Sequence, residues 1–143
     1  MKINDVMRGK SSQDVITISP DATVRDLLAL LSEHNIGAVI VSNDGGSVDG
    51  IVSERDVVRR LHGDDTVLDG PVGSIMTTSV ATCEPGADVD ELMALMTDRR
   101  IRHLPVVDGS SLVGVISIGD VVKSRITQLE FERDQLDSYV HQT

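Results

Sequence analysis

The chain repeats itself, and this internal repeat constrains its fold more than any other feature. When the 143-residue sequence is shifted by 65 positions, residues 15–41 align with residues 80–106, and ten of the 27 aligned positions are identical. After a loop that is one residue shorter in the second copy, GIVSERD (50–56) aligns with GVISIGD (114–120). Such self-similarity indicates two copies of one structural unit.

Each copy is expected to open with a strand and a helix. The segments VITI (15–18) and VATC (80–83) alternate in the way of a short strand, and a proline follows each of them. The next helix begins near Thr23 in the first copy and near Asp88 in the second, because an acidic residue three positions later gives capping-box spacing.

Two adjacent strands and a second helix complete each copy. The apolar runs AVIV (38–41) and GIV (50–52) predict the two strands of the first copy, and HLPVV and LVGVIS are their counterparts in the second. The order is β-α-β-β-α, an α/β (α+β) fold. Because one such unit of roughly 50 residues leaves a sheet face bare, we expect the two repeats to pack sheet to sheet about a pseudo-twofold axis, with two related clefts at the seam.

These patterns divide the chain into four parts. We predict a first repeat at residues 1–62, a linker at 63–73, a second repeat at 74–126 and a C-terminal helical extension at 127–143. The linker prediction depends on the Gly, Asp and Pro content of that segment.

The tail of the chain, residues 121–143, carries a heptad stripe that one arginine interrupts. Two series recur every seven residues: Val122, Leu129 and Leu136, and Ile126, Arg133 and Val140. Two interpretations stay open: a long helix that packs on its own domain, or a helix that contacts a second subunit.

The charge balance excludes several classes of partner. The chain has 13 basic and 23 acidic residues, a net charge of −10, which argues against nucleic acid or an anionic membrane as the main partner. No run approaches the ~18 apolar residues of a membrane span, and the N-terminus lacks a signal-peptide core. A single cysteine, Cys83, is expected to be a small buried side chain in a reducing cytoplasm.

The repeated pattern G-h-h-S-x-x-D, in which h is apolar, has two physical interpretations. A serine where a strand enters a helix lies near the free backbone N–H groups that favour a phosphate, and the Asp three residues later can accept hydrogen bonds from a ribose diol. The alternative is an ordinary N-terminal cap. Gly50 and Gly114 are expected to allow a close backbone approach.

The repeated motifs resemble a tandem pair of CBS domains, the Bateman module. The resemblance rests on SPDATV, NIGAVIV and GIVSERDVV in the first copy and on EPGADV, RIRHLPVV and GVISIGDVV in the second, and it covers about residues 3–126. It implies a module that is usually a homodimer and that binds adenosine-containing ligands: AMP, ADP, ATP or NAD(H), with S-adenosylmethionine less expected. No further cofactor is implied.

The resemblance also implies which residues line the two clefts. The first cleft would comprise Ser53, Arg55, Asp56, Ile36, Ala38, Thr77, Thr78 and Val80. The second would comprise Ser117, Gly119, Asp120, Arg102, His103, Pro105, Ile16 and Arg8.

The two predicted clefts differ in charge. The second carries RRIRH (99–103), and we expect Arg102 and His103 to contact phosphate, while Arg99 and Arg100 are expected to be solvated. The two sites are therefore expected to differ in ligand or affinity.

These residues are compatible with three functions. The first is a non-enzymatic adenine-nucleotide sensor in the cytoplasm, with a possible protein target. The second is an interaction scaffold whose clefts are vestigial. The third is a nucleotide hydrolase, which is disfavoured because the sequence shows neither metal-ligand spacing nor an activated nucleophile, so no catalytic or metal-binding residue is predicted.

Overall fold

The computed structural model describes residues 1–10 and 15–141, so the last two residues of the predicted extension lie outside the described residues. The chain forms two compact units. The terminal unit comprises Met1–Gln13, Pro85–His103 and Ile116–Thr143, and the central unit comprises Asp14–Glu84 and Leu104–Val115. Each unit is described separately.

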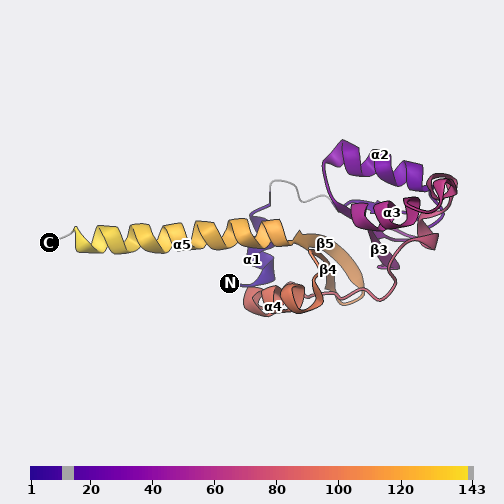
Figure 1. Ribbon diagram of the computed structural model, residues 1–143. Coiled ribbons are helices and arrows are strands. Elements are labelled where there is room, and N and C mark those ends of the chain that lie inside the picture. The colour runs from indigo at the N-terminus through magenta and orange to yellow at the C-terminus, as the bar shows by residue number, and fades with distance from the viewer. Residues whose placement is uncertain (11–14, 142–143) are drawn as a thin grey trace. The chain divides into compact units, whose positions relative to one another are not determined.

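The first repeat has the predicted β-α-β-β-α order and lies within the central unit. Its elements are β1 (Thr17–Ile18), α2 (Val24–His34), β2 (Ala38–Val41), β3 (Gly50–Ser53) and α3 (Glu54–Leu61) (Figure 1). Strand β1 pairs in parallel with β2, and β2 pairs antiparallel with β3. The helix between β1 and β2 is the crossover that parallel pairing requires.

An aliphatic core holds this sheet and its helices together. Every residue of β2 is buried, whereas the neighbouring strand β3 alternates between buried and half-buried positions. The buried cluster consists of Ile18, Val24, Leu27, Leu31, Val39, Val41, Val52, Val57, Val72 and Ile75. Aliphatic side chains of this size each contribute roughly 1.5–3 kcal/mol when fully buried.

The segment predicted as a linker is ordered. It forms two short 3-10 helices, η1 (Asp65–Asp69) and η2 (Val72–Ser74). The Val72 N–H donates to Ala22 O at 2.8 Å, and the Val24 N–H donates to Gly70 O at 3.0 Å, so this segment closes over the start of α2.

The second repeat contributes α4 (Val89–Arg99), β4 (His103–Asp108), β5 (Ser111–Ser117) and α5 (Ile118–Val140), and β4 pairs with β5. The prediction of a strand at residues 80–83 was wrong. Only Cys83 pairs there, with its N–H donating to Pro105 O at 3.1 Å and its carbonyl accepting from the Val107 N–H at 2.8 Å. The segment is therefore a single bridge.

The N-terminus forms a helix that the sequence patterns did not predict, α1 (Ile3–Arg8). It is held to the segment before α4, because the Ile3 N–H donates to Ala87 O at 2.9 Å and the Val89 N–H donates to Met1 O at 3.1 Å. Asp88 makes no capping hydrogen bond, contrary to expectation. Its carboxylate instead accepts from the Lys2 ammonium at 2.6 Å.

The helices α2 and α4 end in the same way, which is strong structural support for the repeat. Asn35 and Arg100 occupy equivalent positions and both have left-handed backbone, with φ of 52° and 54°. One residue later, the N–H of Ile36 donates to Leu31 O and that of Ile101 to Met96 O, both at 3.1 Å. This is the Schellman arrangement, and it turns the chain into the next strand.

The close approach at Gly50 yields a stability prediction. A Cβ built on Gly50 would lie 2.8 Å from both Met76 Sδ and Thr77 O, so Gly50→Ala forces the backbone apart. We expect this variant to lose about 1–3 kcal/mol of unfolding free energy in urea denaturation. The control is Gly86→Ala, because a Cβ there meets no atom within 4 Å. Equal stability of the two variants would contradict the prediction.

Candidate functional site

In the first repeat, Ser53 and Asp56 cap the start of α3 reciprocally. The Asp56 N–H donates to the Ser53 hydroxyl at 3.4 Å, and the Asp56 carboxylate accepts from the Ser53 N–H at 2.9 Å. The Ser53 hydroxyl also donates to the same carboxylate oxygen, Oδ2, at 3.1 Å. Both side chains are half-buried.

The second repeat builds the same cap at the start of α5. The Asp120 N–H donates to the Ser117 hydroxyl at 3.1 Å, and Asp120 Oδ2 accepts from the Ser117 N–H at 2.9 Å. The capping interpretation of the S-x-x-D pattern is therefore confirmed in both copies. The ligand interpretation concerns the other carboxylate oxygen.

That other oxygen, Oδ1, is available at both positions. Among the residues that the structure describes, none donates a hydrogen bond to Oδ1 of Asp56 or Asp120. A carboxylate oxygen has two lone-pair directions, so each Oδ1 can accept from two neighbouring hydroxyl groups. Capping and recognition of a diol are thus compatible on one side chain.

In each repeat, the residue just before β2 or β4 accepts a hydrogen bond from the first residue of the capped helix. The Glu54 N–H donates to Gly37 O at 3.0 Å, and the Ile118 N–H donates to Arg102 O at 2.9 Å. These bonds satisfy the first N–H group of α3 and of α5, which a helix cannot satisfy internally. They also bring Ile36 and Ala38, and in the other copy Arg102 and His103, close to the caps, as the sequence predicted.

The segment at Thr77 lies beside β3, as expected for the first cleft. Ile51 and Thr77 exchange backbone hydrogen bonds of 2.9 and 2.8 Å. Thr77 and Thr78 are exposed and Val80 is half-buried. The first predicted cleft therefore has its components within the central unit, two residues along β3 from the Ser53 cap.

The remaining predicted residues of the first cleft differ in exposure. Arg55 is exposed on the first turn of α3, whereas the Ala38 side chain is buried in β2 and only its backbone can reach a ligand. Ile36 is half-buried and packs against the core of the central unit.

The residues of the second cleft are divided between the two units. Arg102, His103, Ser117, Gly119, Asp120 and Arg8 belong to the terminal unit, whereas Ile16 and Pro105 belong to the central unit. Arg102 and Gly119 are exposed, and His103 is half-buried. The contributions of Ile16 and Pro105 to a site remain predictions.

A lysine that the sequence analysis missed pairs with Asp120. The Lys10 ammonium lies 3.0 Å from Asp120 Oδ2, and both side chains are about three-quarters buried, with 26% and 24% of their surface exposed. Arg8, which was predicted here, pairs with Asp5 within α1 instead. The repeat pattern gave no signal for Lys10, because its counterpart 65 positions later is the apolar residue Ile75.

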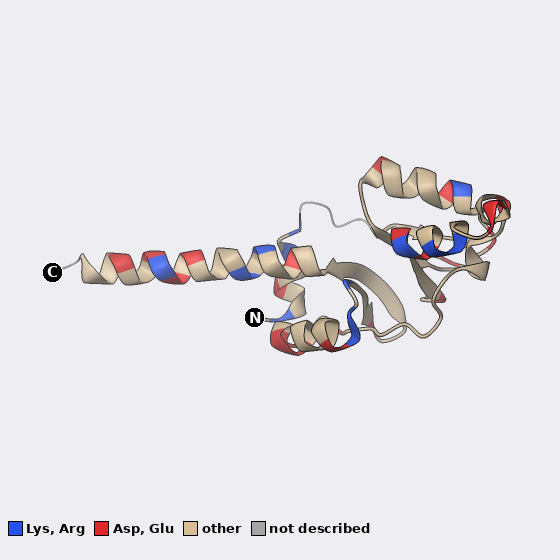
Figure 2. Cartoon of the chain, viewed as in Figure 1, with Lys and Arg blue, Asp and Glu red and all other residues tan. Residues whose placement is uncertain are grey.

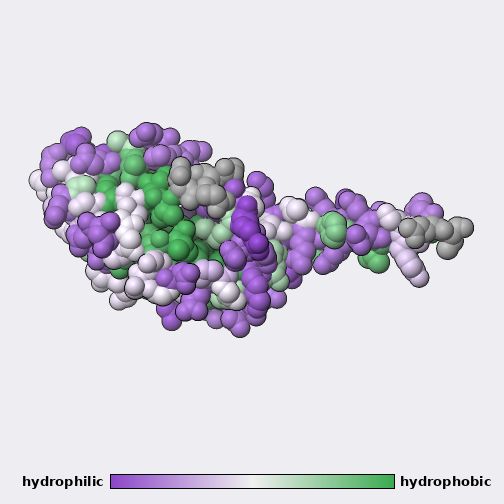
Figure 3. Space-filling model, turned by 180° about the vertical axis from the view of Figure 1, so that it is seen from behind, coloured by the Kyte–Doolittle hydropathy of each residue, from purple (hydrophilic) through white to green (hydrophobic). Residues whose placement is uncertain are grey.

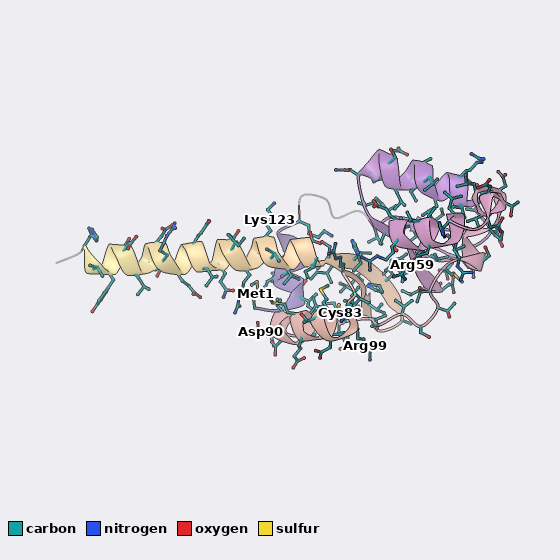
Figure 4. All side chains as sticks on the ribbon, viewed as in Figure 1. Met1, Arg59, Cys83, Asp90, Arg99 and Lys123 are labelled. Atoms are coloured by element: carbon teal, nitrogen blue, oxygen red, sulfur yellow. The ribbon has the colours of Figure 1, made fainter. Side chains whose placement is uncertain are left out.

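This ion pair lies at a cavity of about 210 Å³ within the terminal unit. Figure 4 labels Lys123 on the part of α5 that contacts α1. The cavity is lined by Val6, Gly9, Lys10, Asp120, Lys123, Ser124 and Thr127. Two ammonium groups and two hydroxyls therefore surround one carboxylate, which is a set suited to an anionic group that also carries hydroxyls.

The environment of Asp120 lowers its pKa. Burial acts to raise the pKa of this carboxyl, but hydrogen bonds from the Ser117 N–H and the Lys10 ammonium outweigh burial. A lowered folded-state pKa stabilises the fold above the unfolded value of ~3.9, and this contribution is lost as the pH falls through the folded pKa. Asp120 is thus held as a carboxylate at neutral pH.

The Cys83 thiol is not activated as a nucleophile. Burial raises the pKa of the Cys83 thiol to about 11, so the thiol is protonated at neutral pH. Within residues 1–10 and 15–141, no group of three or more His, Cys, Asp or Glu side chains is placed to hold a metal ion. None of the helices described there is long and apolar enough to span a membrane.

Comparison with known proteins defines the class. The CBS-domain family model matches residues 3–63 and 72–126. The chain is 39% identical to the CBS-domain protein ATU1752 of Agrobacterium tumefaciens, covering 87% of this chain and 99% of that structure with a TM-score of 0.82. It is 35% identical to the mitochondrial protein CBSX3 of Arabidopsis thaliana, covering 96% of this chain and 71% of that protein.

A more distant structure carries ligands. The CBS-domain pair of the protein MJ0100 was solved with 5′-methylthioadenosine and S-adenosylmethionine. It is 22% identical, covers 90% of this chain and 98% of that one, and has a TM-score of 0.77, so it shares the fold.

The fold and the duplicated caps define a tandem repeat of one β-α-β-β-α type of domain. The chain belongs to the CBS-domain family and carries two CBS domains.

The Lys10–Asp120 pair yields a pH prediction. In Lys10→Gln the ammonium no longer favours the charged carboxylate, so we expect the pKa of Asp120 to rise. A carboxyl ¹³C NMR titration measures this. Lys2→Gln is the control, because Lys2 pairs with Asp88. A pKa of Asp120 that is the same in Lys10→Gln and in the unsubstituted protein would rule out the ion pair in solution.

Proposed function

We propose that this chain is a non-catalytic regulatory module that binds an adenine nucleotide, AMP, ADP, ATP or NAD(H), at its Ser-x-x-Asp caps. One observation carries the proposal: each cap uses Oδ2 of its aspartate, and among the described residues none donates to Oδ1, the oxygen that we propose accepts from the ribose hydroxyls. The MJ0100 pair, which holds two adenosine derivatives, supports the same ligand class.

Charge favours a phosphorylated ligand at Asp120. Lys10 and Lys123 line the cavity there, and among the described residues no carboxylate pairs with the Lys123 ammonium. A phosphate that enters this cavity meets cations in a protein whose net charge is −10. We therefore propose that AMP binds this site more tightly than uncharged adenosine, and that S-adenosylmethionine, which is cationic at sulfur, binds less tightly.

The two caps are proposed to differ in affinity. Asp120 has Lys10 as a partner, whereas Asp56 accepts hydrogen bonds only from Ser53 among the described residues. The exposed Arg55 is the nearest cation along the chain on α3. We propose that the Asp120 site binds nucleotide first and that the Asp56 site fills at higher concentration.

Regulation is proposed to follow from this binding. A nucleotide can shift the protein between two arrangements only by the difference between its affinities for them. We propose that the chain acts as a cytoplasmic homodimer that reports the supply of adenine nucleotide to a protein target. A second candidate is an interaction scaffold with vestigial sites, which the exposed apolar residues of α5 favour.

Isothermal titration calorimetry tests the nucleotide proposal. We expect saturable binding of at least one of AMP, ADP, ATP and NAD(H), with Asp120→Ala weakening it at least tenfold because the ribose hydroxyls lose their acceptor. Ser110→Ala is the control, since Ser110 is exposed in the turn between β4 and β5. Absence of binding by all four ligands would favour the scaffold. Equal effects of the two substitutions would contradict the site assignment.

A further inference from the structure

The outer part of α5 carries a stripe of exposed apolar residues. Every residue from Leu129 to Val140 is exposed, and Figure 3 shows hydrophobic groups between hydrophilic ones along this helix. The exposed fractions are 46% at Val122, 51% at Ile126, 55% at Leu129, 66% at Leu136 and 64% at Val140. Exposed apolar residues are unremarkable singly, but a contiguous row marks a contact surface.

The stripe is a heptad seam. Successive members are separated by three or four residues, with Arg133 filling the one remaining position, so all six lie along one face over about 27 Å of helix. This face is distinct from the one that docks on the terminal unit. Val121 is buried there, and Arg125 lies 3.8 Å from Asp90 of α4.

Arg133 decides how two such seams can pair. In a parallel pair each seam residue faces its own copy, so two Arg133 guanidinium groups would meet in the apolar seam. In addition, Glu132 would face Asp137 of the other helix. A parallel pair is therefore disfavoured by repulsion both in the seam and beside it.

An antiparallel pair removes these conflicts. When Val122 lies opposite Val140 of a second helix, Ile126 faces Leu136 and Leu129 faces the aliphatic stem of Arg133. The stem of an arginine can cover apolar surface while its guanidinium reaches the edge. Every apolar position of the stripe then has an apolar partner.

The flanking charges are mixed in this register, because Glu130 and Glu132 each approach their own copies near the twofold axis, where the two Arg133 guanidinium groups lie between them. Lys123 lies opposite Asp137 of the second helix, twice by symmetry, and each Arg133 guanidinium lies within reach of Glu130 and Glu132 of the other copy. Figure 2 shows acidic and basic positions interspersed along the ribbon of α5. Arg133 otherwise pairs only with the exposed Asp134, at 3.2 Å, a contact of little energetic value.

We propose that the occupant of this stripe is the same stripe of a second copy of the chain, in an antiparallel two-helix pair centred near Phe131. The pair is a homotypic contact with twofold symmetry, in which one surface meets itself. No stripe residue caps a helix or lines the cavity at Asp120, but the flanking Lys123 lines that cavity and would also face Asp137 of the second copy.

Engineered disulfides test the pairing and its direction in the full chain. The background is Cys83→Ser, which removes the native thiol. In the antiparallel pair, the double variant Ile126→Cys, Leu136→Cys forms an intermolecular disulfide under mild oxidation, and either single variant does not. In a parallel pair each single variant cross-links to itself. Cross-linking of the single variants, or of none, would overturn the proposal.

A matched pair of substitutions shows that the stripe itself drives the contact. Leu129 lies on the stripe and Phe131 lies on the opposite face of the same helix, and both are exposed, at 55% and 63%. In the double-cysteine variant, we expect Leu129→Glu to lower the disulfide yield at least tenfold and Phe131→Glu to leave it within twofold. Circular dichroism verifies that both remain folded. Equal yields in the two variants would mean random collision and would overturn the proposal.

Discussion

The reciprocal hydrogen bonds between a serine and the aspartate three residues later are the interaction on which the rest of this structure depends. In each repeat they begin the helix that follows the last strand. They also hold a half-buried carboxylate whose Oδ2 accepts hydrogen bonds in the cap and whose Oδ1 accepts none from the described residues. Caps of this kind stabilise a helix by ~1 kcal/mol. The same geometry presents a carboxylate acceptor at a helix N-terminus, whose dipole favours a phosphate. Stability and the proposed recognition therefore share one aspartate side chain but use different oxygens of it.

The two copies have diverged around this shared cap. Lys10 holds the Asp120 carboxylate ionised and adds a cation to its cavity, whereas Asp56 has only Ser53 as its described partner. A duplicated protein can in this way keep one architecture and obtain two sites of different charge. The proposed order of filling, with Asp120 before Asp56, follows from that difference and gives a sensor two ranges of response to one ligand.

Repeated local patterns were predictable from the sequence, and contacts specific to one copy were not. The caps at Ser53 and Ser117 and the glycine at position 50 follow from spacing and residue type, whereas the placement of Thr77 beside the first repeat follows from the family resemblance. The predicted strand at residues 80–83 was wrong because an alternation of apolar and polar residues does not show whether a segment will pair with a neighbouring strand along its length. Lys10 was missed because a cation that folds back from the N-terminus leaves no periodic signal. The nucleotide sites themselves remain predictions.

The carboxyl ¹³C resonance of Asp120 during a titration with AMP tests the central claim most directly, because it observes the proposed acceptor itself. The account predicts a saturable shift whose apparent dissociation constant equals that measured by calorimetry. The shift should be absent when inorganic phosphate, which lacks the diol, replaces AMP. If AMP saturates the protein while the Asp120 resonance stays at its ligand-free position, the carboxylate does not contact the nucleotide and the account is wrong.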